Sequence, residues 1–167
     1  HAGVVKGNAG SPYAIKDYYD IDPDLADNVY ERMDEFEALV RRTHEAGLKV
    51  IIDFVPNHVA REYHSDAKES YIDDLGQKDD ITKAFDPNNN FYYIPGSTLS
   101  LLFGSQQEDF DYGEFPAKVT GNDCFGAYPS QNDWYETVKL NYGVDYLNGR
   151  SKHFDPIPNT WMKMRSE

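Results

Sequence analysis

The sequence lacks several features that would assign it to common classes of protein. Its 167 residues include one cysteine, Cys124, so no internal disulfide can form. Apolar runs such as 50–52 and 101–103 are far shorter than the ~20 residues that span a bilayer, so we predict no membrane span. The chain begins with His1 and shows no signal-peptide pattern, from which we expect an excised or processed segment.

Positive charge is also scarce. The chain has 16 Lys and Arg against 29 Asp and Glu, a formal net charge of −13, and its densest basic stretch covers only 163–165. Binding to nucleic acid requires a basic surface, so we expect no nucleic-acid partner. Phosphate-binding glycine loops, nucleophile elbows and zinc-ligand spacings are missing as well, so no organic cofactor is expected.

Apolar and aromatic residues are plentiful enough for a folded domain, at 40% and 14% of the chain. Half of the aromatic residues lie between Phe85 and Tyr135, within a stretch rich in Asn, Asp, Gly and Ser. Linkers lack aromatic residues, so residues 60–140 are predicted to form an irregular, partly β insertion.

Residues 28–55 have the pattern of half a βαβ unit. A period near 3.6 predicts a helix over 28–46, with Asn28 and Glu31 spaced as a capping box and Gly47 as the C-terminal cap. The apolar, β-branched run 48–55 predicts a strand buried on both faces, which is typical of parallel sheets. The fold class is therefore expected to be α/β.

The end of this strand carries the sharpest motif, Asp53-Phe-Val-Pro-Asn-His58. A charged Asp53 inside a buried strand is costly unless it is paired, and ligand sites form at the carboxyl ends of parallel strands. The residues alone leave two interpretations open. Asp53, Asn57 and His58 belong to a functional site, or Asp53 caps backbone groups and His58 lies on the surface.

The motif resembles the Asp-x-Val-x-Asn-His pattern of the alpha-amylase family, glycoside hydrolase family 13. The segment 10–19, Gly-Ser-Pro-Tyr-Ala-Ile-Lys-Asp-Tyr-Tyr, resembles the family's tyrosine segment, and 139–142, preceded by Trp134, resembles the region that closes its B domain. The resemblance implies a fragment of a TIM (β/α)8 barrel around strands 2–3 and helices 2–3. Its parts would be 1–59 from the barrel, 60–140 as the inserted B domain, and 141–167 as a truncated start of helix 3.

The resemblance also implies roles for individual residues. Tyr13 would stack on a sugar ring, His58 would donate a hydrogen bond to a sugar hydroxyl, and Asp53 would shape the site. Asn57 matches a position that binds calcium in many members, so calcium is a candidate ligand. Further oxygen ligands are offered by Asp86, Asn88, Asn89, Asn90, Asp109, Asp111, Asp123 and Asp133.

The implied reaction is hydrolysis of α-glucosidic bonds in starch-like glucans or oligosaccharides by a retaining, two-carboxylate mechanism. The family's Gly-x-Arg-x-Asp pattern is missing from this sequence, so no residue is assigned as nucleophile or acid, and the chain alone is expected to be inactive. Two alternatives stay open, namely a non-catalytic glucan-binding unit and a transglycosylase or trehalose- or sucrose-acting member. A chance match of the six-residue motif in an unrelated α/β domain is a third, and it predicts that Tyr13 and His58 lie far apart.

Part of a barrel exposes strand edges, and such edges pair with other chains. We therefore expect marginal stability, self-association, or pairing with the remainder of the barrel. The sequence does not specify a compartment, although the family resemblance favours a soluble, secreted or periplasmic protein.

Overall fold

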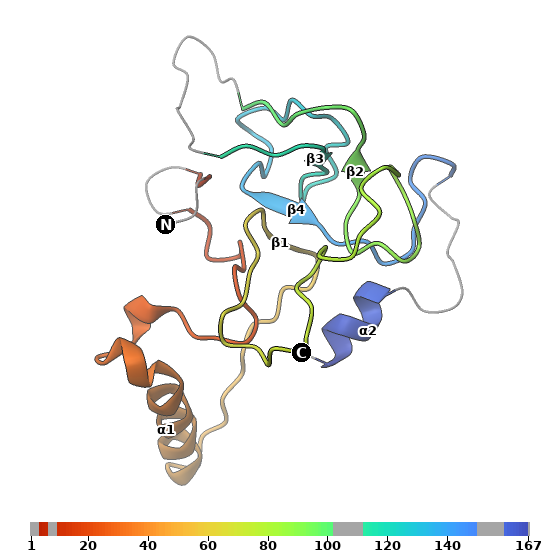
Figure 1. Cartoon of the computed structure of the whole chain (residues 1–167). Helices are drawn as coiled ribbons and strands as arrows, with labels where there is room; N and C mark the ends of the chain where they lie inside the picture. Colours follow the sequence, from red (N-terminus) through yellow and green to blue (C-terminus); the bar gives the residue numbers. More distant parts are fainter. Residues whose placement is uncertain (1–3, 7–9, 102–111, 150–158, 167) are drawn as a thin grey trace.

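The structure is a computed structural model that describes residues 4–6, 10–101, 112–149 and 159–166 (Figure 1). Two helices, two short 3-10 turns and four short strands are found in these ranges. In chain order they are η1 (Pro23–Leu25), η2 (Val29–Glu31), α1 (Arg32–Glu45), β1 (His58–Ala60), β2 (Tyr93–Ile94), β3 (Ala117–Lys118), β4 (Thr137–Lys139) and α2 (Asn159–Ser166).

The predicted helix over 28–46 is confirmed, but its first turn is a 3-10 turn and its cap differs from the prediction. The side chain of Asn28 accepts from the N–H of Tyr30. The role predicted for Glu31 is taken by Glu35, whose carboxylate accepts from the N–H groups of Asp27 and Asn28 at 2.9 and 2.8 Å. Because η2 comes before α1, the reciprocal acceptor is one turn later than the expected Glu31.

The predicted C-terminal cap of α1 is confirmed. Gly47 has φ +77°, a left-handed conformation that glycine adopts without a Cβ penalty. Its N–H bonds to the carbonyl of His44, and the N–H of Leu48 bonds to the carbonyl of Thr43. These two bonds form a Schellman motif, which turns the chain sharply out of the helix.

The prediction of a buried strand over 48–55 is wrong for this structure. The segment forms no strand, and the side chains of Ile51 and Ile52 are 94% and 65% exposed. A buried strand needs neighbouring strands and covering helices, and none of the described segments pairs with it. Only its end is anchored, because the hydroxyl of Tyr18 donates to the carbonyl of Val55 at 2.7 Å and that of Tyr142 donates to Pro56.

The strands form two small antiparallel sheets, β1 with β4 and β2 with β3 (Figure 1). His58 is opposite Lys139 in the first sheet, and Tyr93 is opposite Lys118 in the second. The backbone of Val119 links the sheets, because its N–H donates to Tyr92 and its carbonyl accepts from Lys139. The core lies around these sheets and consists of Val59, Leu75, Phe91, Tyr93, Val138, Leu140 and Met164.

The two helices differ in how they pack. Helix α1 has no buried residue and lies away from the strands in Figure 1. Helix α2 is attached to the core, because Thr160 exchanges hydrogen bonds with Asn90 and the ring of Trp161 lies 4.5 Å from that of Tyr142. In the described part of the chain, neither helix has the length and apolar character needed to cross a bilayer.

Candidate functional site

The tyrosine-rich segment near the start of the chain lies along β1. The N–H of Ala60 donates to the carbonyl of Ile15 at 2.8 Å, and the N–H of His64 donates to that of Lys16 at 3.1 Å. At the start of the same strand, the imidazole of His58 donates to the backbone carbonyl of Tyr13. The structure therefore brings together two motifs that are 45 residues apart in the sequence.

The ring of His58 is buried, and protein groups engage it on both sides. Its Nδ1 lies 3.0 Å from the amide nitrogen of Asn57, which also donates to the carbonyl of Gly121 at 3.3 Å. An amide nitrogen only donates, so Nδ1 accepts and the proton of the neutral ring is on Nε2. Burial lowers the pKa of His58, as does the charge of Lys139, while the Tyr13 carbonyl opposes the shift. These effects favour a neutral imidazole.

A tryptophan from the neighbouring strand region covers the same histidine. The ring centroid of Trp134 is 5.2 Å from that of His58. Its backbone is held on both sides, because its N–H donates to the side chain of Asn122 and its carbonyl accepts from Thr137. Trp134 and Tyr13 are 46% and 50% exposed, so both residues that contact the buried imidazole are partly open to solvent.

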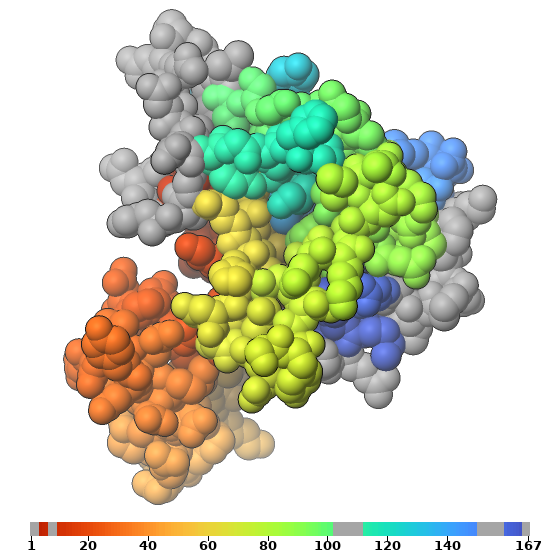
Figure 2. Space-filling view, viewed as in Figure 1, coloured from red at the N-terminus to blue at the C-terminus, as the bar shows by residue number. Residues whose placement is uncertain are grey.

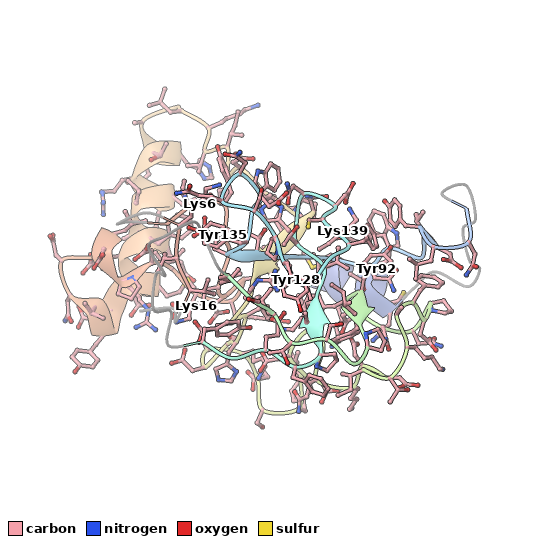
Figure 3. All side chains as sticks on the ribbon, turned by 90° about the horizontal axis from the view of Figure 1, so that it is seen from above. Lys6, Lys16, Tyr92, Tyr128, Tyr135 and Lys139 are labelled. Carbon is pink, nitrogen blue, oxygen red and sulfur yellow. The ribbon has the colours of Figure 1, made fainter. Side chains whose placement is uncertain are left out.

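Lys139 lies opposite His58 on the paired strand and places a positive charge near its ring. Figure 3 labels the side chain of Lys139. Its ammonium group lies 2.6 Å from a carboxylate oxygen of Asp123 and 5.2 Å over the ring of Tyr146. The side chain is only 10% exposed, so the lysine lies in the wall of the site. Its charge is balanced by Asp123, which leaves no uncompensated charge between these two residues.

Among the residues proposed for calcium, the described carboxylates Asp86 and Asp133 have other partners. Asp86 accepts from Lys83 and Asn88, and Asp133 accepts from Ser130 and Asn122. Asp109 and Asp111 lie outside the described residues. Within the described ranges, the one group of three carboxylates close enough to share an ion is Asp17, Asp20 and Asp66, and Asp20 is paired with Arg32.

Within the described ranges, no group of three carboxylates lies around Asn57. None of Asp86, Asp123 and Asp133 belongs to a group that could share an ion. Calcium binding stays a prediction, and no step below depends on it. The burial expected for Asp53 is wrong because its segment is unpaired and exposed, so the argument from a costly buried charge no longer applies to it.

Sequence reasoning placed Tyr13 and His58 in one site but gave no role to Trp134 or Lys139. Both belong to the region that resembles the closing segment of the B domain. The signal that could have identified Trp134 was the position of this aromatic residue shortly before that segment. Its contact with His58 depends on the β1–β4 pairing, which a single sequence does not specify.

Comparison with known proteins identifies similar sequences in one family. The profile described as the alpha amylase catalytic domain matches residues 6–113. Alpha-amylase 3 of Dictyoglomus thermophilum is 32% identical over 111 residues, which cover 60% of this chain and 20% of that protein. Maltase 1 of Drosophila virilis is 35% identical over 97 residues, covering 56% of this chain and 14% of the maltase.

A shorter match extends beyond the glycosidases. An amino acid transporter heavy chain of Rattus norvegicus is 43% identical over 51 residues, which cover 30% of this chain and 7% of that protein. The chain thus spans a fifth or less of the length of these three relatives. No solved structure matches the chain.

Proposed function

This chain belongs to the alpha-amylase family, and on that premise we propose that it forms part of a glycoside hydrolase acting on α-glucosidic bonds. The family relationship implies a TIM barrel as the catalytic domain. In the proposed arrangement, residues 1–59 belong to the barrel around strands 2–3 and helices 2–3, 60–140 form the inserted B domain, and 141–167 return to the barrel. The proposed substrates are starch-like glucans or their oligosaccharides.

The observation that carries this proposal is the contact of Tyr13 and Trp134 with the buried imidazole of His58. Open aromatic faces pack well against the C–H face of a pyranose ring. A buried neutral imidazole supplies a directed hydrogen bond without adding charge, which suits a neutral hydroxyl group. A sugar hydroxyl reaches His58 by replacing the Tyr13 carbonyl as the acceptor of its proton.

The proposed chemistry uses two carboxylates that are not among these 167 residues. In a retaining hydrolase one carboxylate attacks the sugar carbon and the other protonates the leaving oxygen. The described part of the chain would then bind and orient the substrate, with Tyr13 stacking on the ring and His58 bonding to a hydroxyl. Asp53 would shape the site from the exposed segment before it.

Isothermal titration of the chain with maltooligosaccharides tests this proposal. Tyr13→Ala should weaken binding about tenfold, because removal of an aromatic contact costs up to about 1.4 kcal/mol. Tyr71→Ala is the matched control, since Tyr71 is 81% exposed and outside the site, and it should bind as the wild type does. Equal affinities for the wild type and Tyr13→Ala would overturn the assignment.

One observation favours a second candidate, a non-catalytic glucan-binding unit. A stretch of 51 residues of the chain is similar to a transporter heavy chain, whose name describes no glycosidase. This candidate predicts binding of oligosaccharides without turnover, even when the chain is joined to any remaining part of the protein. A family member that transfers glycosyl groups, acting on trehalose or sucrose, would instead be recognised by its products.

The exposed apolar residues support association with another polypeptide. Ile51, Ile52 and Phe54 are each more than half exposed and lie on one unpaired segment. Their burial would be favourable by roughly 1.5–3 kcal/mol per fully buried side chain. The proposed partner is a second copy of the chain or the remainder of the barrel.

A further inference from the structure

A second concave region lies on the β2–β3 sheet, apart from the site around His58. It encloses about 420 Å³, within the range of small-ligand pockets. On the face shown in Figure 2, segments 74–93 and 112–118 lie side by side. The lining residues used below are Asp74, Gln77, Phe91, Glu114, Phe115 and Lys118. Tyr13, His58 and Trp134 are not part of the lining.

The charged groups of this pocket are already paired with protein groups. Asp74 lies 2.7 Å from His64 and 3.5 Å from Lys68. Glu114 lies 2.7 Å from Arg61 and 3.4 Å from Lys118, and its side chain is only 5% exposed. A charged ligand such as phosphate or an amine would find its counter-charge occupied, so the pocket suits a neutral ligand.

Apolar and polar groups are arranged for a ligand that carries both kinds of surface. Phe91 is 3% exposed in the core, whereas the ring of Phe115 is 68% exposed at the rim. Gln77 accepts from the N–H of Asp74 through its amide oxygen, which leaves its NH2 group to donate to a ligand. Paired carboxylates keep free lone pairs, so Asp74 can still accept from a hydroxyl group.

We propose that this pocket is a second carbohydrate-binding site, which holds one neutral pyranose unit of an oligosaccharide or polysaccharide. The C–H face of the sugar stacks on Phe115, and its hydroxyls bond to Gln77 and Asp74. The choice of an α-glucan as the polysaccharide rests on the proposed function. The position of the pocket and the neutrality of its ligand rest on the geometry and the charge pairing.

Titration calorimetry of the chain with maltooligosaccharides, together with depletion onto insoluble starch, tests the inference. Phe115→Ala should weaken binding at one site about tenfold and reduce the amount bound to starch, while Tyr13→Ala should affect the other site. Phe115 is exposed, so its removal should leave folding intact, which circular dichroism verifies. Tyr128→Ala, at a residue that is 76% exposed and outside the pocket, should behave as the wild type does.

The outcomes separate this inference from the proposed function. Normal binding by Phe115→Ala with weakened binding by Tyr13→Ala overturns the second site and leaves the proposed function standing. Weakened binding by Phe115→Ala with normal binding by Tyr13→Ala supports the second site and overturns the role of Tyr13. Inorganic phosphate serves as a charged probe and should not bind, and phosphate binding that Phe115→Ala or Gln77→Ala weakens would contradict the neutral-ligand assignment.

Discussion

The imidazole of His58 donates a hydrogen bond to the backbone carbonyl of Tyr13. The bond joins the two motifs on which the family resemblance depends, and it makes a chance match of the six-residue motif untenable, since that alternative required the two residues to lie far apart. Trp134, which precedes β4, contacts the same ring. His58 is therefore the residue at which the tyrosine segment, β1 and β4 meet.

Stability should depend on pH through His58. Burial lowers the pKa of His58 in the folded state, so the unfolded chain binds the proton more readily, beginning near its ordinary pKa of about 6.5. Stability from the neutral ring is thus fully present above about pH 6.5 and is lost as pH falls toward the lowered pKa. In urea unfolding at about pH 7.5 and about pH 5, His58→Gln should lose less stability than the wild type on acidification.

His44→Gln is the control for that comparison, because His44 is exposed at the end of α1. It should lose stability on acidification at least as much as the wild type does. A pH dependence in His58→Gln equal to that of the wild type would show that the ring is not protected from protonation in the folded state.

The buried ion pair between Arg61 and Glu114 should be the most sensitive polar contact in the core. Arg61 is 3% exposed and donates to Glu114 at 2.7 Å, and burial lowers its pKa while Glu114 opposes the shift. Glu114→Ala leaves a buried charge without its partner and should cost about 3–5 kcal/mol in urea unfolding. Asp73→Ala breaks a surface pair with Lys78, whose side chain is 72% exposed, and should cost less than about 1 kcal/mol. Similar losses in both variants would contradict the account.

The cap of α1 gives a local prediction. A Cβ at Gly47 would meet no atom within 4 Å, so Gly47→Ala is penalised only by its φ of +77°. The cost should be about 1–2 kcal/mol for the left-handed conformation. Because α1 buries no residue, the effect should appear as faster hydrogen exchange in residues 42–45 and not in β1 or β4. Equal protection of α1 in both proteins would contradict the assigned cap.

Local signals in the sequence were sufficient for α1 and its C-terminal end. The helical period and Gly47 depend on neighbours within one or two turns, and both predictions are confirmed. The run 48–55 has an equally strong local pattern, yet its side chains are exposed. A strand is stabilised by partners distant in sequence, which no local pattern supplies. The local pattern of 48–55 therefore predicted a strand that the structure does not form.

The same contrast between local patterns and contacts distant in sequence applies to the candidate site. The resemblance placed Tyr13 and His58 in one site, and the structure brings them into contact. The position of Trp134 beside His58 follows from the β1–β4 register, and the pocket near Phe115 follows from the β2–β3 pairing. Both pairings join segments far apart in the sequence, so neither contact was accessible from residue patterns alone.

The exposed run before His58 predicts self-association. Sedimentation velocity of the chain should show an average mass that rises with concentration, because Ile51 and Ile52 bury apolar surface on pairing. Ile51→Glu combined with Ile52→Glu should remain monomeric. Leu25→Glu, at a residue of η1 that is 80% exposed and outside this run, should associate as the wild type does. A wild-type chain that stays monomeric at every concentration would rule out this surface as a self-association interface.

The most direct test of the central claim is a product assay on this chain with starch, maltooligosaccharides, pullulan, sucrose and trehalose, resolved by chromatography. The account predicts binding of maltooligosaccharides with no new sugar products, because the chain supplies Tyr13 and His58 but no assigned pair of carboxylates. Products that appear with the wild type and disappear with both Tyr13→Ala and His58→Ala would contradict it, since a working carboxylate pair would then lie within these 167 residues.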